Sequence, residues 1–385
     1  MALSIETIER ILKRNFSSAT KIQVLARGPE SFQTIFDALR KAERFICLQF
    51  YIFRNDETGT ALSEILKQRS REGVNVYLLY DHFGSFGTPR HFWAEMRRAG
   101  VHIRASRPFK WRTPFKYVHR DHRKLVVIDS QKAFTGGLNI ANEYSGFHLR
   151  RRGRVWRDTG ILLKGPIVRE LFLIFRESWS SWRGEALPSL ETEGKRSVPP
   201  HGKHIPALPI FAYSGGSRKR MRKLLSHCAE HAQRSISLTT AYFIPSRRMI
   251  QTLARAENRG VQVKLLVPGK SDVPAASFAG RAFFGKLLEA GVEIHTYRGE
   301  MLHAKTYVFD CCWSIIGSTN LDYQSLLYND EGNVGIFDAA FGLEMTEVFH
   351  RDLNQSIRIE KESWEKRPLL EKLKESFFAL FKKRL

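Results

Sequence analysis

Two short apolar runs set the hydrophobic pattern of the chain. Residues 74–80 and 261–267 are each entered through a glycine and are typical of strands that are buried on both faces of a sheet. A helical pattern of apolar residues precedes each run, over residues 61–71 and 249–259. Strands that alternate with helices predict an α/β sandwich in each half of the chain.

The same sequence patterns occur in both halves, which indicates an internal duplication. Residues 50–53 (FYIF) correspond to residues 241–245 (AYFIP), and residues 72–79 (EGVNVYLL) correspond to residues 259–266 (RGVQVKLL). Between the halves the chain is rich in Pro, Gly, Ser and Glu and lacks a regular apolar pattern, which favours a linker. We therefore predict an N-terminal domain of residues 1–184, a linker of residues 185–209, a C-terminal domain of residues 210–365 and a tail of residues 366–385.

Each half contains the same set of polar residues at the same spacing. In both copies a lysine follows a histidine by two positions, an aspartate follows it by seven and an asparagine by seventeen. Such agreement between two separate segments is not expected by chance. The first copy consists of His122, Lys124, Asp129, Gly136, Gly137 and Asn139, and the second of His303, Lys305, Asp310, Gly317, Ser318 and Asn320.

The histidine, lysine and asparagine of each copy are the candidate catalytic residues. Residues 125–128 and 306–309 are predicted strands, so alternation places the histidine and the lysine before each strand on one face. The glycine-rich segments lead to Asn139 and Asn320 at predicted helix starts, where backbone N–H groups attract anions. Lysine, asparagine and these amides together can hold a phosphate. The aspartates, the glycines and Ser318 are interpreted as supporting residues, and a purely structural role suits Asp129 and Asp310 equally well.

Two imidazoles can divide the roles of nucleophile and general acid near neutral pH. A carboxylate should orient each ring, and Asp158 and Glu331, downstream of the two motifs, are the candidates. A metal-dependent mechanism would need converging carboxylates or histidines, whereas the repeated motif supplies lysine. We therefore expect no metal and no cofactor.

The overall charge predicts an anionic partner. The chain has 62 Lys and Arg against 39 Asp and Glu, a formal net charge of +23, which fits nucleic acid and an anionic membrane surface alike. Its four cysteines lack the spacing of a zinc site. No segment has the roughly 20 apolar residues that span a bilayer. We expect a cytoplasmic protein with peripheral membrane contact, and the sequence predicts no oligomeric state.

The two ends of the chain are amphipathic, and each allows two interpretations. In the tail, apolar residues recur at helical spacing among lysines, which suits a helix that lies on anionic lipid or a helix that packs on the protein core. Residues 1–14 allow the same two interpretations. The apolar residues of the tail are Leu369, Leu370, Leu373, Phe377, Leu380 and Phe381.

The repeated pattern His-x-Lys-x4-Asp, followed by Gly-Gly-x-Asn or Gly-Ser-x-Asn, resembles the signature of the phospholipase D superfamily. Residues 121–129 (DHRKLVVID), 134–140 (FTGGLNI) and 317–333 (GSTNLDYQSLLYNDEGN) are similar to bacterial cardiolipin synthases. The resemblance implies two tandem α/β/α sandwich domains, related by a pseudo-two-fold axis, with the active site at their interface. It also implies that His122 is the nucleophile and His303 the acid.

The resemblance further implies a phosphatidyltransferase that acts through a phosphohistidine and converts two molecules of phosphatidylglycerol into cardiolipin and glycerol. Phospholipid would be its substrate, and the inner face of the cell membrane its location. Three alternatives stay open: a phospholipase D-type hydrolase, a metal-independent nuclease of the same superfamily, and a degenerate member that serves as a membrane-binding scaffold. Both motifs are complete, which argues against the scaffold, and nucleic acid is the less favoured partner.

Overall fold

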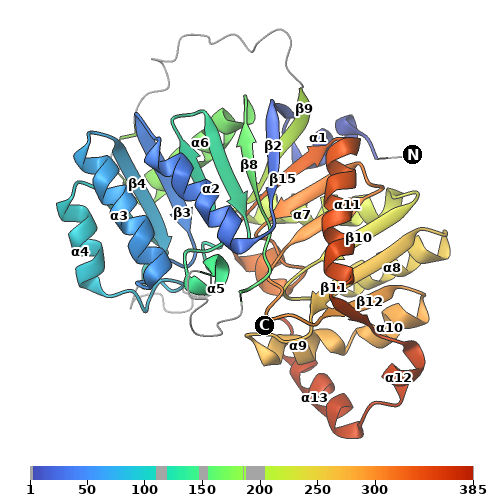
Figure 1. Ribbon diagram of the computed structural model, residues 1–385. Coiled ribbons are helices and arrows are strands. Elements are labelled where there is room, and N and C mark those ends of the chain that lie inside the picture. Colours follow the sequence, from blue (N-terminus) through green and yellow to red (C-terminus); the bar gives the residue numbers. More distant parts are fainter. Residues whose placement is uncertain (1–2, 110–118, 147–154, 185, 188–203, 385) are drawn as a thin grey trace. The chain divides into compact units, whose positions relative to one another are not determined.

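The computed structural model describes residues 3–109, 119–146, 155–184, 186–187 and 204–384. The chain divides into two compact units (Figure 1). Ser17–Val155 and Gly160–Pro209 form one, here called the N-terminal unit. Met1–Phe16, Trp156–Thr159 and Ile210–Leu385 form the other, the C-terminal unit.

A seven-stranded sheet forms the centre of the N-terminal unit, in the order β2-β8-β7-β6-β3-β4-β5. The β3-β4 and β4-β5 pairs are parallel, whereas all other neighbours are antiparallel. The central strand β3 is buried at every position because helices cover both faces of the sheet. The strands are β2 (Lys21–Leu25), β3 (Phe45–Phe50), β4 (Asn75–Asp81), β5 (His102–Ser106), β6 (Leu125–Ile128), β7 (Lys132–Gly136) and β8 (Gly160–Lys164), and the short β1 (Ser17–Ala19) pairs with the first residues of β9 (Ile205–Ala212).

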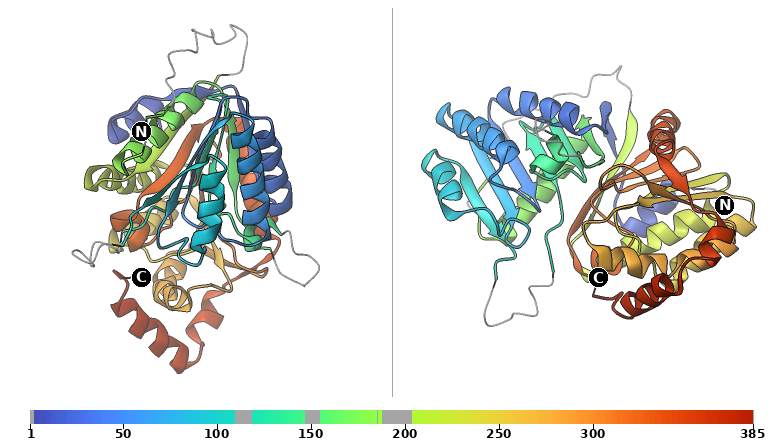
Figure 2. Two further views of the ribbon diagram at one scale, coloured as in Figure 1. Left: turned by 90° about the vertical axis from the view of Figure 1, so that its left-hand side faces the viewer. Right: turned by 60° about the horizontal axis from the view of Figure 1, so that its bottom comes forward.

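The helices of the N-terminal unit lie on both faces of its sheet. α2 and α3 pack side by side on one face, and α6 packs on the other (Figures 1 and 2). α3 begins where the Asp56 carboxylate accepts a hydrogen bond from the Gly59 N–H, which is the usual N-cap arrangement. The helices are α2 (Gly28–Arg40), α3 (Glu57–Arg71), α4 (Arg90–Arg98), α5 (Asn142–Ser145) and α6 (Ile167–Ser181).

The C-terminal unit repeats this sheet in the order β15-β14-β13-β10-β11-β12, with β16 beside β12 and the end of β9 beside β15. Again three successive strands make two parallel pairs, β10-β11 and β11-β12, and the motif strands make antiparallel pairs. The strands are β10 (Ser235–Thr239), β11 (Gln262–Pro268), β12 (Glu293–Tyr297), β13 (Thr306–Phe309), β14 (Trp313–Gly317), β15 (Glu331–Phe337) and β16 (Ser356–Arg358).

Helices again cover both faces of this second sheet. α7 and α8 pack together on one face, and α11 packs across the other. The helices are α1 (Ile5–Leu12), α7 (Gly215–His231), α8 (Arg247–Asn258), α9 (Pro274–Arg281), α10 (Phe284–Glu289), the π-helical turn η3 (Gln324–Tyr328), α11 (Ala339–Leu353), α12 (Lys361–Glu365) and α13 (Leu369–Leu380).

The two sheets confirm the predicted fold class. The predicted strands at residues 125–128 and 306–309 are β6 and β13, with the same bounds. They occupy equivalent places, because each lies antiparallel to the first strand of a parallel trio. The repeated sequence patterns therefore correspond to a repeated strand topology in the two sheets.

Two segments lie in a different unit from the one that the sequence predicts. Residues 1–16 belong to the C-terminal unit because α1 buries Ile8 and Ile11 and packs against α7. Residues 156–159 belong there because Arg157 forms a β-bridge with Leu302.

The tail and the predicted linker differ in how far the structure describes them. α13 packs with the C-terminal unit rather than forming a separate part. In the predicted linker, residue 185 and residues 188–203 lie outside the described residues. Across the described ranges, none of the helices is long and apolar enough to pass through a bilayer.

Candidate active site

The first motif lies at the start of β6. His122 and Lys124 alternate with Asp121 and Arg123 along the extended chain, so the two pairs point to opposite faces. Lys124 Nζ donates to the His122 carbonyl oxygen at 2.7 Å. The ring of Tyr51 lies edge-on to the His122 ring, with centroids 4.9 Å apart. The predicted imidazole and ammonium therefore share one buried face.

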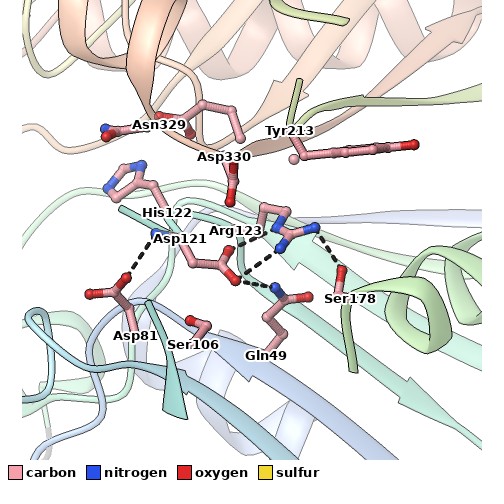
Figure 3. A network of polar contacts seen from close by, with 12 residues as sticks. Gln49, Asp81, Ser106, Asp121, His122, Arg123, Ser178, Tyr213, Asn329 and Asp330 are labelled. Atoms are coloured by element: carbon pink, nitrogen blue, oxygen red, sulfur yellow. Dashed lines mark hydrogen bonds and ion pairs between the residues drawn. The ribbon is translucent and has the colours of Figure 1, made fainter. Parts of the chain in front are cut away.

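A buried polar network holds the opposite face of the first motif (Figure 3). Arg123 donates to both carboxylate oxygens of Asp121, at 2.8 and 2.9 Å, and to the Ser178 hydroxyl at 2.7 Å. Gln49 Nε2 donates to the same carboxylate at 2.7 Å. Burial alone would raise the pKa of Asp121, but the charge and hydrogen bonds of Arg123 and the hydrogen bond from Gln49 together keep this pKa lowered. The network ties the motif to β3 and α6.

Asp81 supports the same segment from the end of β4. Its carboxylate accepts from the Asp121 N–H at 2.8 Å and from the N–H groups of Phe83 and Gly84 at 2.9 Å each. Burial raises the pKa of Asp81 to about 6. This carboxylate fixes the residue immediately before His122.

The second motif lies at the start of β13 and differs on its opposite face. Leu302 and Ala304 take the positions of Asp121 and Arg123, and both pack in an apolar cluster. The His303 N–H donates to the Arg157 carbonyl oxygen at 2.7 Å. His303 and Lys305 are buried, so this copy reaches the same imidazole and ammonium arrangement through apolar packing.

Asp158 contacts the second imidazole. Its Oδ2 lies 2.7 Å from His303 Nδ1, and both groups are buried. Because a carboxylate oxygen only accepts, Nδ1 carries the proton, and Nε2 remains to exchange a proton with a substrate. Lys305 Nζ also lies 2.8 Å from Nδ1, but two donors do not bond each other, so we assign its hydrogen bond to the His303 carbonyl oxygen. Asp158 is thus placed to position the ring, and its effect on catalysis stays a prediction.

The segment that carries Asp158 is held on both sides. The Arg157 N–H donates to the Met301 carbonyl oxygen at 2.9 Å, and Arg157 Nε donates to Asp352 at 2.8 Å. The Thr159 N–H donates to the second Asp158 oxygen at 2.7 Å. Both oxygens of the Asp158 carboxylate therefore have partners, and its orientation toward His303 is fixed.

The pKa of the Lys305 ammonium is unusually low. Burial lowers the pKa of its ammonium to about 8, although the carboxylates of Asp158 and Glu331 favour the charged form. The group is therefore charged at neutral pH and loses its proton just above it. In its charged form it is suited to stabilise a phosphoryl oxygen.

The helix starts predicted at the two motif asparagines are wrong. α5 begins three residues after Asn139, and η3 begins four residues after Asn320. The backbone is extended here instead, because the next residues, Ile140 and Leu321, form β-bridges with the segments that follow β3 and β10. Free amides of a helix N-terminus do not contribute at these positions.

The asparagine side chains bind those same segments. Asn139 Oδ1 accepts from the Ile52 N–H at 3.1 Å, and its Nδ2 donates to the Tyr144 hydroxyl at 2.9 Å. Asn320 Oδ1 accepts from the Tyr242 N–H at 3.3 Å. Each asparagine therefore positions the loop beside its imidazole, and its role in phosphate binding stays a prediction.

Glu331 lies fully buried at the start of β15. Its carboxylate accepts a hydrogen bond from the Ser318 hydroxyl, which in turn accepts from the Gly332 N–H at 3.0 Å. A Cβ at the preceding Gly317 would lie 2.3 Å from an Asn333 oxygen, so only glycine fits there. In the other copy Gly136 has φ 144°, a conformation that also favours glycine. The predicted orienting role of Glu331 stays a prediction.

The motif aspartates have equivalent structural contacts in the two units. The Asp129 carboxylate accepts from three consecutive N–H groups, at residues 43–45, at 2.8 to 2.9 Å. The Asp310 carboxylate accepts from the N–H groups of residues 233–235 at 2.7 to 3.0 Å. Each aspartate has a left-handed backbone, with φ 51° and 53°. Both residues therefore fix the start of β3 or β10 to the end of the motif strand.

Asp310→Ala is expected to lower the free energy of unfolding by about 3 kcal/mol, because three backbone N–H groups lose a charged acceptor and alanine tolerates a left-handed φ poorly. Asp310→Asn keeps one acceptor oxygen and should lose about half as much. Urea unfolding would measure both. Turnover by the folded fraction should change little, and a loss of turnover without a loss of stability would assign chemistry to this carboxylate instead.

Two tyrosines beside the motifs are site residues that the sequence reasoning missed. Tyr51 follows β3, and Lys124 Nζ lies 5.3 Å from its ring centroid. Tyr242 follows β10 and lies edge-on to His303, with ring centroids 6.5 Å apart, while its hydroxyl donates to Asp272 at 2.8 Å. Their recurrence at one position of the duplication was the available signal.

Each unit therefore offers one imidazole and one ammonium on a common buried face. A neutral imidazole can attack phosphorus, and a protonated one can give its proton to a leaving oxygen. Among the residues that the structure describes, no three His, Cys, Asp or Glu side chains converge in a way that could hold a metal ion. The residues present suit the transfer of a phosphodiester through a histidine.

Comparison with known proteins identifies relatives along nearly the whole chain. The family model "Cardiolipin synthase, PLD-like domain" matches residues 35–149 and 225–353, and each matched segment contains one complete motif. Cardiolipin synthase 2 of Bacillus anthracis is 34% identical over 376 residues, which cover 97% of this chain and 72% of that protein. The cardiolipin synthase of Geobacillus sp. (strain WCH70) is 34% identical over 382 residues, which cover 98% and 74%.

Solved structures share the fold at much lower sequence identity. Phosphatidylserine synthase of Haemophilus influenzae Rd KW20 is similar with a TM-score of 0.76 and 15% identity, over 99% of this chain and 100% of that one. Polyphosphate kinase of Porphyromonas gingivalis is similar with a TM-score of 0.60 and 13% identity, over 99% of this chain and 56% of that one. These two likenesses concern the fold alone.

Proposed function

This chain belongs to the cardiolipin synthase family of phospholipase D-like proteins, and from that premise we propose that it is a phosphatidyltransferase. It transfers a phosphatidyl group from one phosphatidylglycerol molecule to another, which forms cardiolipin and releases glycerol. The observation that carries this proposal is the pair of complete motifs, each with a buried imidazole and a buried ammonium. A scaffold protein would not need either set.

In the first step, the neutral imidazole of His122 attacks the phosphorus of one phosphatidylglycerol. The bond from phosphorus to the glycerol headgroup oxygen breaks, and His303 gives its Nε2 proton to that oxygen. The products are a phosphatidyl-histidine and free glycerol. Lys124 and Lys305 stabilise the phosphoryl oxygens, while Asp158 keeps the proton on His303 Nδ1.

In the second step, His303 takes a proton from the headgroup hydroxyl of a second phosphatidylglycerol. The resulting oxygen nucleophile attacks phosphorus, the bond from phosphorus to His122 breaks, and cardiolipin is released. His122 is then neutral and His303 protonated, so the cycle closes without a metal or a cofactor. Glu331 is proposed to orient His122, and the amides of Asn139 and Asn320 to assist in holding the phosphate.

We place this activity at the inner face of the cell membrane, with the protein bound peripherally. Its substrates reside in a bilayer, and a net charge of +23 attracts an anionic surface. Phosphatidylglycerol supplies that negative charge and is also the proposed substrate.

Incubation of the purified protein with phosphatidylglycerol vesicles, in the presence of a chelator, is expected to yield cardiolipin and glycerol in equal amounts. The equality follows because each transfer releases one headgroup. Lipid chromatography and a glycerol assay measure the two products. Single- and double-stranded DNA, incubated separately, should stay intact.

Other products would point to other members of the superfamily. Phosphatidic acid without cardiolipin would replace the transferase with a hydrolase, because water would then resolve the intermediate. DNA cleavage without any lipid product would replace it with a nuclease. Activity that disappears with the chelator and returns with a divalent cation would contradict the two-imidazole mechanism.

A further inference from the structure

The last helix of the C-terminal unit carries most of its large apolar residues on the outside. α13 packs along α9 at the margin of this unit (Figure 1). Six large apolar side chains of α13 and the residue after it are between 43% and 79% exposed. A helix on a globular protein usually buries its apolar stripe. These six residues, called here the α13 outer face, are Leu369, Leu370, Leu373, Phe377, Leu380 and Phe381.

Charged contacts hold the opposite side of α13 against the protein. Among the described residues of α13, Glu375 is the one that is buried. Its carboxylate accepts from Arg281 at 3.0 Å and from Arg367 at 2.7 Å. Both guanidinium groups also lie over the Trp364 ring, 5.2 and 4.2 Å from its centroid. Because Glu375 is fixed in this way, the helix cannot turn to bury its apolar residues.

The α13 outer face is continuous and has basic margins. An α-helix turns by about 100° per residue, so its six positions fall within an arc of about 120°. Lys374 lies at one margin of this arc and Lys372 across the other, while Lys383 and Arg384 follow at the end of the helix. Apolar residues flanked by lysine are the pattern of a helix that lies in a membrane interface, since lysine can reach toward headgroups.

The first helix of the same unit provides an internal contrast. α1 is amphipathic too, but it buries Ile8 and Ile11 and packs against α7. The core interpretation therefore holds for α1. Phe378 packs against an apolar cluster of the C-terminal unit, but the core interpretation fails for the six residues of the α13 outer face, because they are exposed.

We propose that α13 is a membrane-docking helix, which lays its outer face on an anionic phospholipid bilayer. The proposal rests on the proposed function in one respect, that the substrate is a bilayer phospholipid. Charge favours a bilayer over a second copy of the chain, because two copies of net charge +23 repel each other whereas phosphatidylglycerol attracts each of them. Docking through α13 holds the C-terminal unit, and with it His303, at the surface that contains the substrate.

The test is to measure binding to vesicles of phosphatidylglycerol and phosphatidylcholine, and to vesicles of phosphatidylcholine alone, by co-sedimentation. Replacing Leu373 and Phe377 together by serine is expected to weaken binding to the anionic vesicles about tenfold or more, because burial of even one such side chain is worth about a factor of ten. The matched control replaces Leu343 and Ile357 by serine, since both have similar exposure and lie on other elements of this unit. The control should bind as the wild type does.

A second variant tests the charged margins. Lys374→Glu combined with Lys383→Glu keeps the apolar residues. It should weaken binding to the vesicles that contain phosphatidylglycerol but not to the vesicles of phosphatidylcholine alone. Circular dichroism should be unchanged in all variants, because each substituted side chain is exposed. Equal binding of the wild type and the serine variant would overturn the proposal. So would a serine variant that loses self-association in sedimentation but keeps its vesicle binding, because a second copy would then cover the helix.

Binding and turnover can be separated. The His303→Ala variant should bind vesicles as the wild type does. Adding the serine substitutions at Leu373 and Phe377 to His303→Ala should still weaken this binding, because docking does not depend on the chemistry of the site. With monomeric short-chain phosphatidylglycerol, the serine variant should turn over at the wild-type rate. A loss on monomers as large as the loss on vesicles would overturn the docking role. Absence of cardiolipin in every protein, with the binding difference intact, would reject the proposed function and leave the docking helix standing.

Discussion

His122→Ala and His303→Ala are each expected to lower kcat/KM for phosphatidylglycerol by about 10⁴-fold or more. The first substitution removes the nitrogen that bonds to phosphorus, and the second removes the group that protonates the leaving glycerol oxygen. The double variant should be little worse than either single variant, because groups that act in one sequence of steps are not additive. Cardiolipin formation from phosphatidylglycerol vesicles measures all three.

The control for these variants is His350→Ala, because His350 lies exposed on α11 and has no place in the proposed chemistry. It should keep wild-type turnover. Wild-type protein denatured at alkaline pH, where the phosphorus–nitrogen bond persists, should carry a phosphatidyl group on His122, and His122→Ala should carry none. Residual turnover above about one-hundredth of the wild type, in either alanine variant, would be too high for the loss of an essential nucleophile or acid and would refute the mechanism.

The sequence predicted the two motif strands because the information is local and repeated. A run of four mostly apolar residues follows each His-x-Lys segment, LVVI in the first copy and TYVF in the second, and both runs are strands with the predicted bounds. Alternation then places the histidine and the lysine on one face without any knowledge of the partners. The sequence also provided Asp158 as a candidate to orient an imidazole, but it did not predict the contact with His303, which lies 145 residues further along the chain.

The support behind the first motif was not predicted, because its partners are distant in sequence. Gln49 and Ser178 bind Asp121 and Arg123 across 72 and 55 residues, and no motif spacing encodes such pairs. One signal was available. In the second copy the corresponding positions are Leu302 and Ala304, so the first copy carries an ion pair where the second has core residues.

The sequence could not predict which unit residues 156–159 join, nor which side of a terminal helix is exposed, because both depend on contacts between distant segments. Residues 156–159 lie within the N-terminal half of the chain, yet Arg157 finds its partners, Leu302 and Asp352, in the C-terminal unit. For the amphipathic ends, the pattern shows that a helix has an apolar side but not which side faces the protein. In α13 the buried Glu375 decides that question, and its two arginine partners come from elements outside the helix.

Lys305→Met is expected to lower kcat/KM by about 10³-fold, because a preorganised charge that stabilises the phosphoryl oxygens is lost. Burial lowers the pKa of this ammonium to about 8, so wild-type kcat/KM should fall as pH rises through 8, where the charge disappears. The bound anionic diester favours the charged ammonium, so the fall in kcat should lie at higher pH than the fall in kcat/KM. Lys305→Arg keeps the charge and should shift the fall to still higher pH.

Lys305→Met should also stabilise the fold, and this gain in stability separates a catalytic role of Lys305 from a structural one. The folded pKa of Lys305 is about 8 and the ordinary value is 10.5, so the folded state binds fewer protons between these two pH values and stability rises with pH there. The cost of burying the ammonium is present in full below pH 8, and Lys305→Met should remove up to about 3 kcal/mol of it. Urea unfolding at pH 7 measures this gain, with Lys264→Met, on the partly exposed β11 residue, as the control. A Lys305→Met variant that is less stable than the wild type would contradict this cost of burial. If the remaining activity of Lys305→Met still falls at pH 8, the titrating charge belongs to another group.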